Sequence, residues 1–245
     1  MCHPPGVAMI ESRGVFKAVP LNVLSDLAKA NYILDRLVEH DTEWSDFQGT
    51  GRRELAAAHL ARHYTDPTVC VLEVWRMDGA MDLCGLLGFS DIVRGVDAQF
   101  HPIFFDGRLR NAAGKRDLLL RTVDWAFRAW DLHRVSLTIP ETAFALLDFA
   151  RKKLGFRFEG ERRIIKQRRA VEHGHHRKSL RWQTVTPTSR EAEWGSRRYQ
   201  ALLKNGVWHD VLLLSLTRDE FADFVREATW DSSTAPLPSK PSPET

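Results

Sequence analysis

Segments with the hydrophobic period of a helix alternate along this chain with short runs of strand-forming residues. The best-defined helix covers residues 115–131, and one of its faces carries Leu119, Val123, Ala126 and Trp130. Strand-like runs stand on both sides of it, at residues 98–105 and 133–139. Neither kind of element can bury its apolar side alone, so this alternation predicts an α/β or α+β fold in which helices cover a sheet.

The hydrophobic pattern along the chain predicts the full order of helices and strands. We predict helices over residues 20–39, 52–64, 115–131 and 143–154, and one that begins at Thr217. We predict strands over residues 69–76, 83–93, 98–105, 133–139, 156–167 and 207–216. No internal repeat is present.

Residues at the ends of these segments support the boundaries. Pro20 suits the first turn of a helix, and Gly155 is placed to end one as its C-cap. Thr217 and Glu220 have the spacing of a capping box. Pro102 lies within a predicted strand, so we expect a bulge or a strand break there.

The length of 245 residues suits one large domain, since such a chain buries roughly 70–75% of its unfolded surface. We assign residues 1–12 to an N-terminal tail and 13–230 to the folded domain. That domain contains an insert at about residues 168–203. The Ser- and Pro-rich residues 231–245 are expected to be disordered.

The sequence also indicates in which cellular compartment the protein is expected. No apolar run approaches the 18–20 residues of a membrane span, and the N-terminus has no secretory pattern. The three cysteines are widely spaced and none forms a CxxC pair, which favours reduced thiols. We therefore expect a cytoplasmic protein with no membrane partner.

Positive charge is concentrated in residues 151–181. This window holds twelve basic and three acidic residues, although the whole chain has a net charge of only +3. Such a stripe can attract polyanions, and a nucleic-acid module is one hypothesis for it. Few aromatic residues interleave the charges, which disfavours nucleic acid as a partner. The motif at 173–176, His-Gly-His-His, has no cysteine nearby, and we predict no metal site.

Two motifs give the chain a family resemblance. Residues 151–160 read RKKLGFRFEG, and residues 205–221 read NGVWHDVLLLSLTRDEF. Both resemble the GNAT superfamily of acyl-CoA N-acyltransferases, in particular its branch that acetylates the N-termini of ribosomal proteins. The resemblance implies a mixed, mostly antiparallel sheet flanked by helices. It also implies acetyl-CoA as cofactor and acetyl transfer to a primary amine by direct attack in a ternary complex.

The family binds the pyrophosphate with a loop of the type Q/R-x-x-G-x-G/A before a helix. The best register here is residues 109–114, where Gly114 matches and Ala112 replaces the first glycine. Leu109 stands where Gln or Arg is expected. The resemblance thus implies a cofactor-binding set of Arg110, Ala112, Ala113, Gly114, Lys115 and Arg116.

Two further roles follow from the resemblance. A backbone N–H on the strand before that loop would bind the thioester carbonyl. Pro102 lacks this group, so Phe104 or Phe105 is expected to supply it. For the acceptor's proton, the candidate bases are His101 on the same strand and Glu141 after the next strand.

The chain also departs from the family pattern. Phe144 and Leu147 stand where many relatives have Asn and Ser, so no side chain there can protonate the leaving thiolate. An alternative is therefore a catalytically weakened GNAT-fold protein that serves as a binding or structural subunit. Divergent chains of this kind occur in bacteriophages, where such a subunit would be virion-associated.

The acceptor stays open between a protein N-terminus, a lysine and a small molecule. A homo-oligomer is left open too, with the aliphatic residues 212–216 as a candidate sheet edge between subunits.

Overall fold

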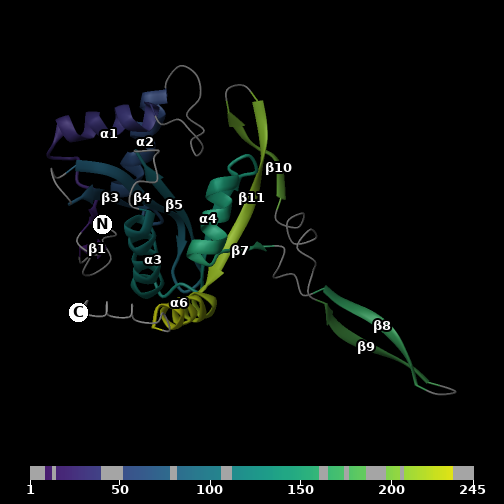
Figure 1. Ribbon diagram of the computed structural model, residues 1–245. Coiled ribbons are helices and arrows are strands. Elements are labelled where there is room, and N and C mark those ends of the chain that lie inside the picture. The colour runs from purple at the N-terminus through teal and green to yellow at the C-terminus, as the bar shows by residue number, and fades with distance from the viewer. Residues whose placement is uncertain are drawn as a thin grey trace, which may run out of the picture.

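The computed structural model contains a large sheet with helices on both faces and a separate two-stranded sheet (Figure 1). The structure describes residues 9–12, 15–39, 52–77, 82–105, 112–159, 165–173, 177–185, 197–204 and 207–233. Residues 1–8 and 234–245 lie outside these ranges.

The helices are α1 (Leu27–Glu39), α2 (Arg52–Thr65), α3 (Ala112–Ala129), α4 (Phe144–Leu154) and α6 (Arg218–Ser233). The first strands are β1 (Ile10–Ser12), β2 (Phe16–Pro20), β3 (Cys70–Arg76), β4 (Asp82–Val93), β5 (Asp97–Phe104) and β6 (Arg134–Pro140). The remaining strands are β7 (Arg157–Phe158), β8 (Ile165–His173), β9 (Arg177–Val185), β10 (Arg197–Lys204) and β11 (Val207–Thr217).

The large sheet has nine strands in the order β1-β2-β3-β4-β5-β6-β11-β10, and β7 also pairs with β11. Among the described strands, β5 and β6 form the single parallel pair. The expected mixed, mostly antiparallel sheet flanked by helices is confirmed. Among the described strands, β8 and β9 pair only with each other, and they overlap the insert expected at about 168–203.

Each face of the sheet has its own apolar core. One face packs against α3, α4 and α6, and its buried residues run continuously from β1 to β11. The other face packs against α1 and α2 in a smaller cluster that includes Leu21, Ile33, Leu60 and Val71. Strand β3 contributes to both clusters because alternate residues of a strand point to opposite faces.

The N-terminal region differs from the prediction. Residues 10–12 are not tail but β1, which pairs with β2. The first helix begins at Leu27 rather than at Pro20, which ends β2. The chain stays extended beyond Pro20 because the Leu21 N–H donates to the Val71 carbonyl at 3.0 Å. The helix begins where the Asp26 carboxylate accepts the Lys29 N–H, a cap that the prediction missed.

Three other predictions were wrong. The strand expected over 156–167 is divided, because β7 pairs with β11 whereas β8 pairs with β9. Helix α6 continues to Ser233, into the tail assigned from 231. Residues 212–216 are no sheet edge, since β11 lies between β6 and β10.

Helix α4 ends at Gly155, which is its C-cap as predicted from the sequence. Gly155 has a left-handed φ of 80° and its N–H donates to the Ala150 carbonyl. A Cβ atom at this position would also lie 2.7 Å from Cγ of Phe224 on α6. The capping box is confirmed as well, since the Thr217 N–H and hydroxyl both donate to the Glu220 carboxylate.

We predict that Gly155→Ala destabilises the protein more than Gly95→Ala. Both glycines have positive φ, 80° and 76°, so both variants lose about 1–2 kcal/mol to backbone strain. Only Gly155 has a neighbour that a methyl group would meet, because no atom lies within 4 Å of the corresponding position at Gly95. Chemical denaturation should show an additional loss of about 1–3 kcal/mol for Gly155→Ala. Equal losses would contradict the packing role.

Candidate functional site

Strands β5 and β6 pair only at their beginnings. The parallel ladder joins Asp97–Gln99 to Arg134–Ser136 and then stops, although both strands continue. At its base Arg134 forms an ion pair with Asp97, and at its end the Gln99 amide donates to the Thr138 hydroxyl at 2.8 Å. Beyond that point β5 and β6 are not hydrogen-bonded to each other, so backbone groups on their facing edges can bind a ligand.

The structure distinguishes the two expected backbone donors. The Phe105 N–H donates to the Cys84 carbonyl on β4 at 2.8 Å. Backbone groups of successive residues point to opposite edges of a strand, so the Phe104 N–H points to the β6 edge, where the ladder has ended. Phe104 therefore suits the expected role better than Phe105.

The break predicted at Pro102 is wrong. Strand β5 continues past this residue, which pairs with Leu87 of β4. The nitrogen of Pro102 lies on the same edge as that of Phe104, so its missing N–H removes no bond to β4. On the other edge β6 has already separated. Gly85 assists the close pairing, because a Cβ there would overlap the Ile103 carbonyl oxygen.

The expected phosphate loop is partly helical. Ala112, Ala113 and Gly114 form the first turn of α3 rather than a loop before it, and Arg110 lies outside the described residues. Gly114 has a packing function, because a Cβ there would lie 3.1 Å from the Phe16 ring. Its carbonyl also accepts the Ser12 hydroxyl at 2.7 Å. The first turn of a helix still presents N–H groups without intrahelical partners.

The two basic residues that follow make contacts within the protein. Lys115 is buried, and its Nζ lies 4.8 Å from the centre of the Phe104 ring. Arg116 donates through Nε to the Lys153 carbonyl at the end of α4, at 2.9 Å. Both contacts fix the start of α3 against β5 and α4. Their expected role toward a phosphate remains a prediction.

Polar side chains replace apolar ones on part of the sheet. On the face covered by α1 and α2, the core is apolar beneath those helices. From β4 to β11 the same face carries Ser90, Gln99, His101, Ser136, Thr138 and Ser215, all buried or partly buried. We call these six residues the polar strip. A sheet face that only supported a core would be apolar, so the polar strip is a candidate binding surface.

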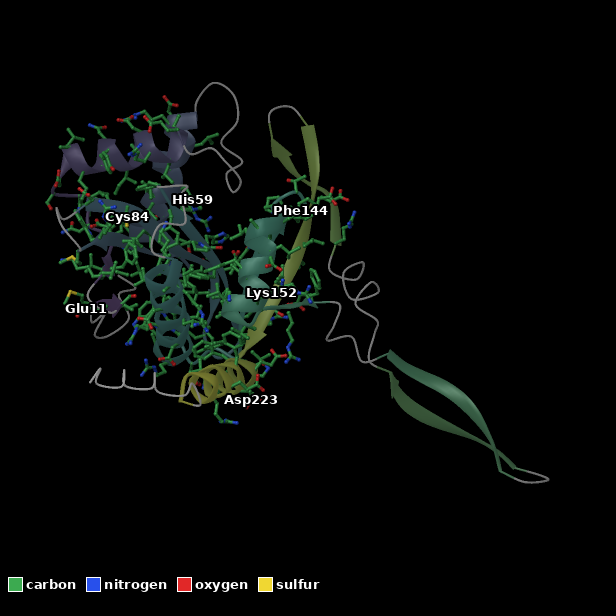
Figure 2. All side chains as sticks on the ribbon, viewed as in Figure 1. Glu11, His59, Cys84, Phe144, Lys152 and Asp223 are labelled. Carbon is green, nitrogen blue, oxygen red and sulfur yellow. The ribbon has the colours of Figure 1, made fainter. Side chains whose placement is uncertain are left out.

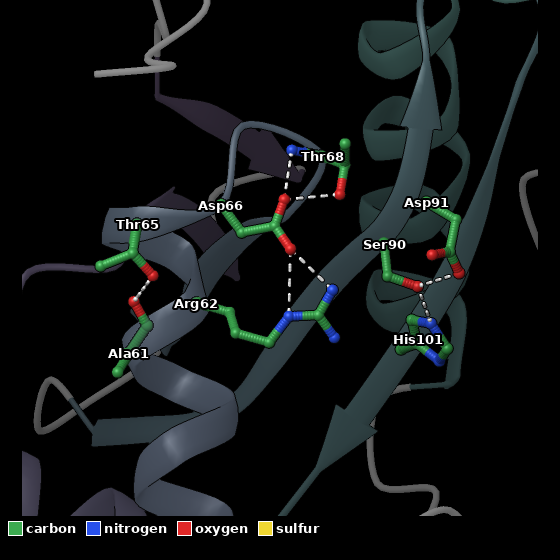
Figure 3. A network of polar contacts seen from close by, with 8 residues as sticks. All are labelled: Ala61, Arg62, Thr65, Asp66, Thr68, Ser90, Asp91 and His101. Carbon is green, nitrogen blue, oxygen red and sulfur yellow. Dashed lines mark hydrogen bonds and ion pairs between the residues drawn. The ribbon is translucent and has the colours of Figure 1, made fainter.

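His101 lies in the polar strip. Its Nε2 is 2.9 Å from the Ser90 hydroxyl, which in turn donates to the Asp91 carboxylate at 3.1 Å (Figure 3). Burial lowers the pKa of His101 to about 4, and the charge of His59 contributes in the same direction. Asp91 opposes this shift more weakly. The imidazole is therefore neutral at pH 7, with a lone pair on one of its two ring nitrogens.

Glu141, which directly follows β6, is part of an ion-pair cluster. Its carboxylate is 3.0 Å from Arg197 of β10, which is also 3.4 Å from the Asp210 carboxylate. The Glu141 N–H donates to the Asp210 carbonyl. Neither Arg197 nor Asp210 was predicted as a site residue. Arg197 lies on β10, in the insert, where no strand was predicted, and Asp210 lies on β11. At the start of α4, Phe144 is 73% exposed (Figure 2).

The basic window is partly used within the fold. Lys152 pairs with Asp148, and the Arg151 guanidinium lies over the Phe158 ring. Residues 174–176 of the His-rich motif lie outside the described ranges. Within the part of the chain that the structure describes, no three His, Cys, Asp or Glu side chains gather to hold a metal ion. None of the helices in that part is long and apolar enough to cross a membrane.

We predict that His101 makes the protein less stable in acid. An unfolded chain protonates this histidine below about pH 6.5, whereas the folded protein does so only near pH 4. Unfolding therefore takes up a proton between these values, and the stability falls as the pH is lowered through them. Between pH 7 and pH 5, wild type should lose about 1–2 kcal/mol more than His101→Gln in urea titrations. Parallel losses in the two proteins would contradict the low pKa.

Comparisons with known proteins bear on the fold. No protein-family model and no curated protein match the sequence. Ribosomal-protein-S5-alanine acetyltransferase from Vibrio fischeri is similar in structure, with a TM-score of 0.57 at 17% identity, over 87% of this chain and 98% of that one. The spermidine/spermine N-acetyltransferase SpeG from Vibrio cholerae has a TM-score of 0.57 at 14% identity, over 86% and 98%.

A third similar structure is RimL, a ribosomal L7/L12 alpha-N-protein acetyltransferase in complex with coenzyme A. Its TM-score is 0.57 at 12% identity, over 87% of this chain and 99% of that one. The resemblance of the two sequence motifs is thus matched by the three-dimensional structure. The chain has the fold of the GNAT acetyltransferases.

Proposed function

We propose that this protein is an acetyl-CoA-dependent N-acetyltransferase that transfers an acetyl group to a primary amine by direct attack in a ternary complex. One observation carries the proposal. Strands β5 and β6 separate after three residue pairs, and the Phe104 N–H points to the edge that is left open. Negative charge grows on a carbonyl oxygen under attack, and a fixed backbone donor stabilises that charge.

Two features fit acetyl-CoA, which would supply an acetyl group activated as a thioester. The first turn of α3 offers N–H groups and the positive end of the helix dipole, which suit a pyrophosphate. The Phe104 N–H lies on the strand that leads toward this turn. The coenzyme A complex of RimL supports the same choice of cofactor.

We propose that the amine that accepts the acetyl group binds against the polar strip. His101 is neutral at pH 7 and would take the proton that the amine loses as it attacks. Glu141, held by Arg197, would contribute negative charge for a cationic acceptor. Similar structures are named for a ribosomal protein and for spermidine, so peptide N-termini and polyamines both belong in the first screen.

A second candidate function is a GNAT-fold subunit with weakened catalysis. Specific contacts favour it: Arg116 is hydrogen-bonded to the end of α4, and Glu141 is ion-paired with Arg197. Leu147 packs against the core, where many relatives have a hydroxyl group. Such a protein could keep cofactor binding and lose turnover.

The first experiment is a thermal melt with acetyl-CoA, with CoA and ATP as comparisons. We expect acetyl-CoA and CoA to raise Tm and ATP to leave it unchanged. At a ligand concentration about 100-fold above Kd, one site adds about 2.7 kcal/mol, or roughly 5–10 °C for a chain of this length. No shift in a protein that melts cooperatively would contradict the proposed function.

Variants of Phe104 separate binding from catalysis. Phe104→Pro removes the N–H without removing a bond to β4, whereas Phe104→Leu keeps the N–H and loses the ring. With a responsive amine, acetyl transfer should fall by about 100-fold in Phe104→Pro and much less in Phe104→Leu. A Tm shift without turnover on any amine would favour the second candidate function.

A further inference from the structure

Ser90, Asp91 and His101 form a continuous hydrogen-bonded chain across strands β4 and β5 (Figure 3). In a regular strand, neighbouring side chains point to opposite faces, so Asp91 could not reach the hydroxyl of Ser90. Here the register of β4 shifts between Ser90 and Val93, and Asp91 has a φ of 52°. This bulge brings the Asp91 carboxylate to Ser90.

The backbone conformation of Asp91 has an energetic cost. The left-handed region costs most residues with a side chain about 1–2 kcal/mol, and Asp is among those that adopt it more readily. Strain of this size persists where the surrounding structure enforces it, and it is concentrated at functional sites. At Asp91 the strained backbone accompanies one specific contact, the carboxylate with the Ser90 hydroxyl. That contact determines the direction of every hydrogen bond in the chain.

The number of protons available determines which atom donates in each of these hydrogen bonds. A serine hydroxyl has one proton, and an ionised carboxylate only accepts hydrogen bonds. Since Ser90 donates its proton to Asp91, it can only accept from His101. The ring atom of His101 that faces Ser90 is Nε2, at 2.9 Å, so Nε2 must carry the proton. In a neutral imidazole the other nitrogen, Nδ1, then holds the lone pair.

We propose that Ser90 and Asp91 are positioning residues that hold His101 in the tautomer protonated on Nε2, so that Nδ1 is the atom that accepts the amine's proton. As the amine nitrogen bonds to the acetyl carbon it becomes positively charged, and the C–S bond of the thioester would break. Coenzyme A would then leave as a thiolate that takes a proton from solvent. One proton passes from this nitrogen to Nδ1, and the electron pair of that N–H bond stays on nitrogen. The imidazolium then releases the proton to solvent.

The charged groups around His101 agree with this assignment. Asp91 approaches from β4 and stabilises the imidazolium form, whereas His59 approaches from α2 and opposes it. Burial keeps the resting ring neutral at pH 7. Neutralising Asp91 would therefore affect both the tautomer and the imidazolium. The catalytic part of the proposal depends on the proposed function, whereas the tautomer does not.

The test is nuclear magnetic resonance of protein with ¹⁵N-labelled histidine, in which two-bond couplings identify the protonated ring nitrogen. Wild type at pH 7 should show His101 protonated on Nε2. Asp91→Asn keeps a residue that tolerates positive φ, but its amide can donate to Ser90. The Ser90 proton can then turn to Nε2, so the population should move toward the Nδ1-protonated tautomer. Ser90→Ala should give a mixture, and Ser90→Thr should resemble wild type.

Kinetics supply the second readout. Asp91→Asn and Ser90→Ala should each lower kcat about tenfold with little change in KM for acetyl-CoA, and Ser90→Thr should restore most of it. A wild-type His101 protonated on Nδ1, or an unchanged tautomer in Asp91→Asn, would overturn the proposal. If no amine is acetylated, the proposed function fails, and the resonance experiment still decides the tautomer.

Discussion

The site depends on a parallel ladder of only three residue pairs between β5 and β6. Three side-chain contacts join the two strands: the Asp97–Arg134 ion pair, the Gln99–Thr138 hydrogen bond, and the hydrogen bond that the Ser136 hydroxyl donates to the Ala98 carbonyl. Beyond it each strand follows its other neighbour. Strand β5 stays paired with β4 as far as Phe104, and β6 stays paired with β11 as far as Pro140. The opening thus results from two longer antiparallel ladders that hold the strands apart.

The two faces of the sheet differ in the side chains that they carry. The face under α3, α4 and α6 is an apolar core that extends through the whole sheet and sets its shape. The opposite face has an apolar cluster beneath α1 and α2 and carries the polar strip from β4 to β11. Buried polar groups need hydrogen-bond partners, and Gln99 with Thr138 and His101 with Ser90 satisfy one another. These pairs keep the polar strip ordered before any ligand binds.

Local signals predicted the parts of the fold that are locally determined. The helix around Leu119 and Val123, the left-handed Gly155 and the capping box at Thr217 all follow from nearby residues. Strands β1 and β2 were missed because their short runs gain stability only by pairing within the sheet. Among the candidate site residues, His101 and Phe104 could be assigned from the sequence to one strand, which the structure shows as β5. Their partners could not, since the Ser90–Asp91 contact depends on a bulge and the Glu141–Arg197 contact on a distant strand.

The most direct test of the central claim follows the amide of Phe104 in protein labelled with ¹⁵N-phenylalanine. Leucine variants at positions 104 and 105 assign the two amide resonances. Adding acetyl-CoA should shift the Phe104 amide strongly and the Phe105 amide much less, because the latter is bonded to Cys84. Saturable acetyl-CoA binding with an unmoved Phe104 amide would contradict the claim that the opening between β5 and β6 receives the thioester.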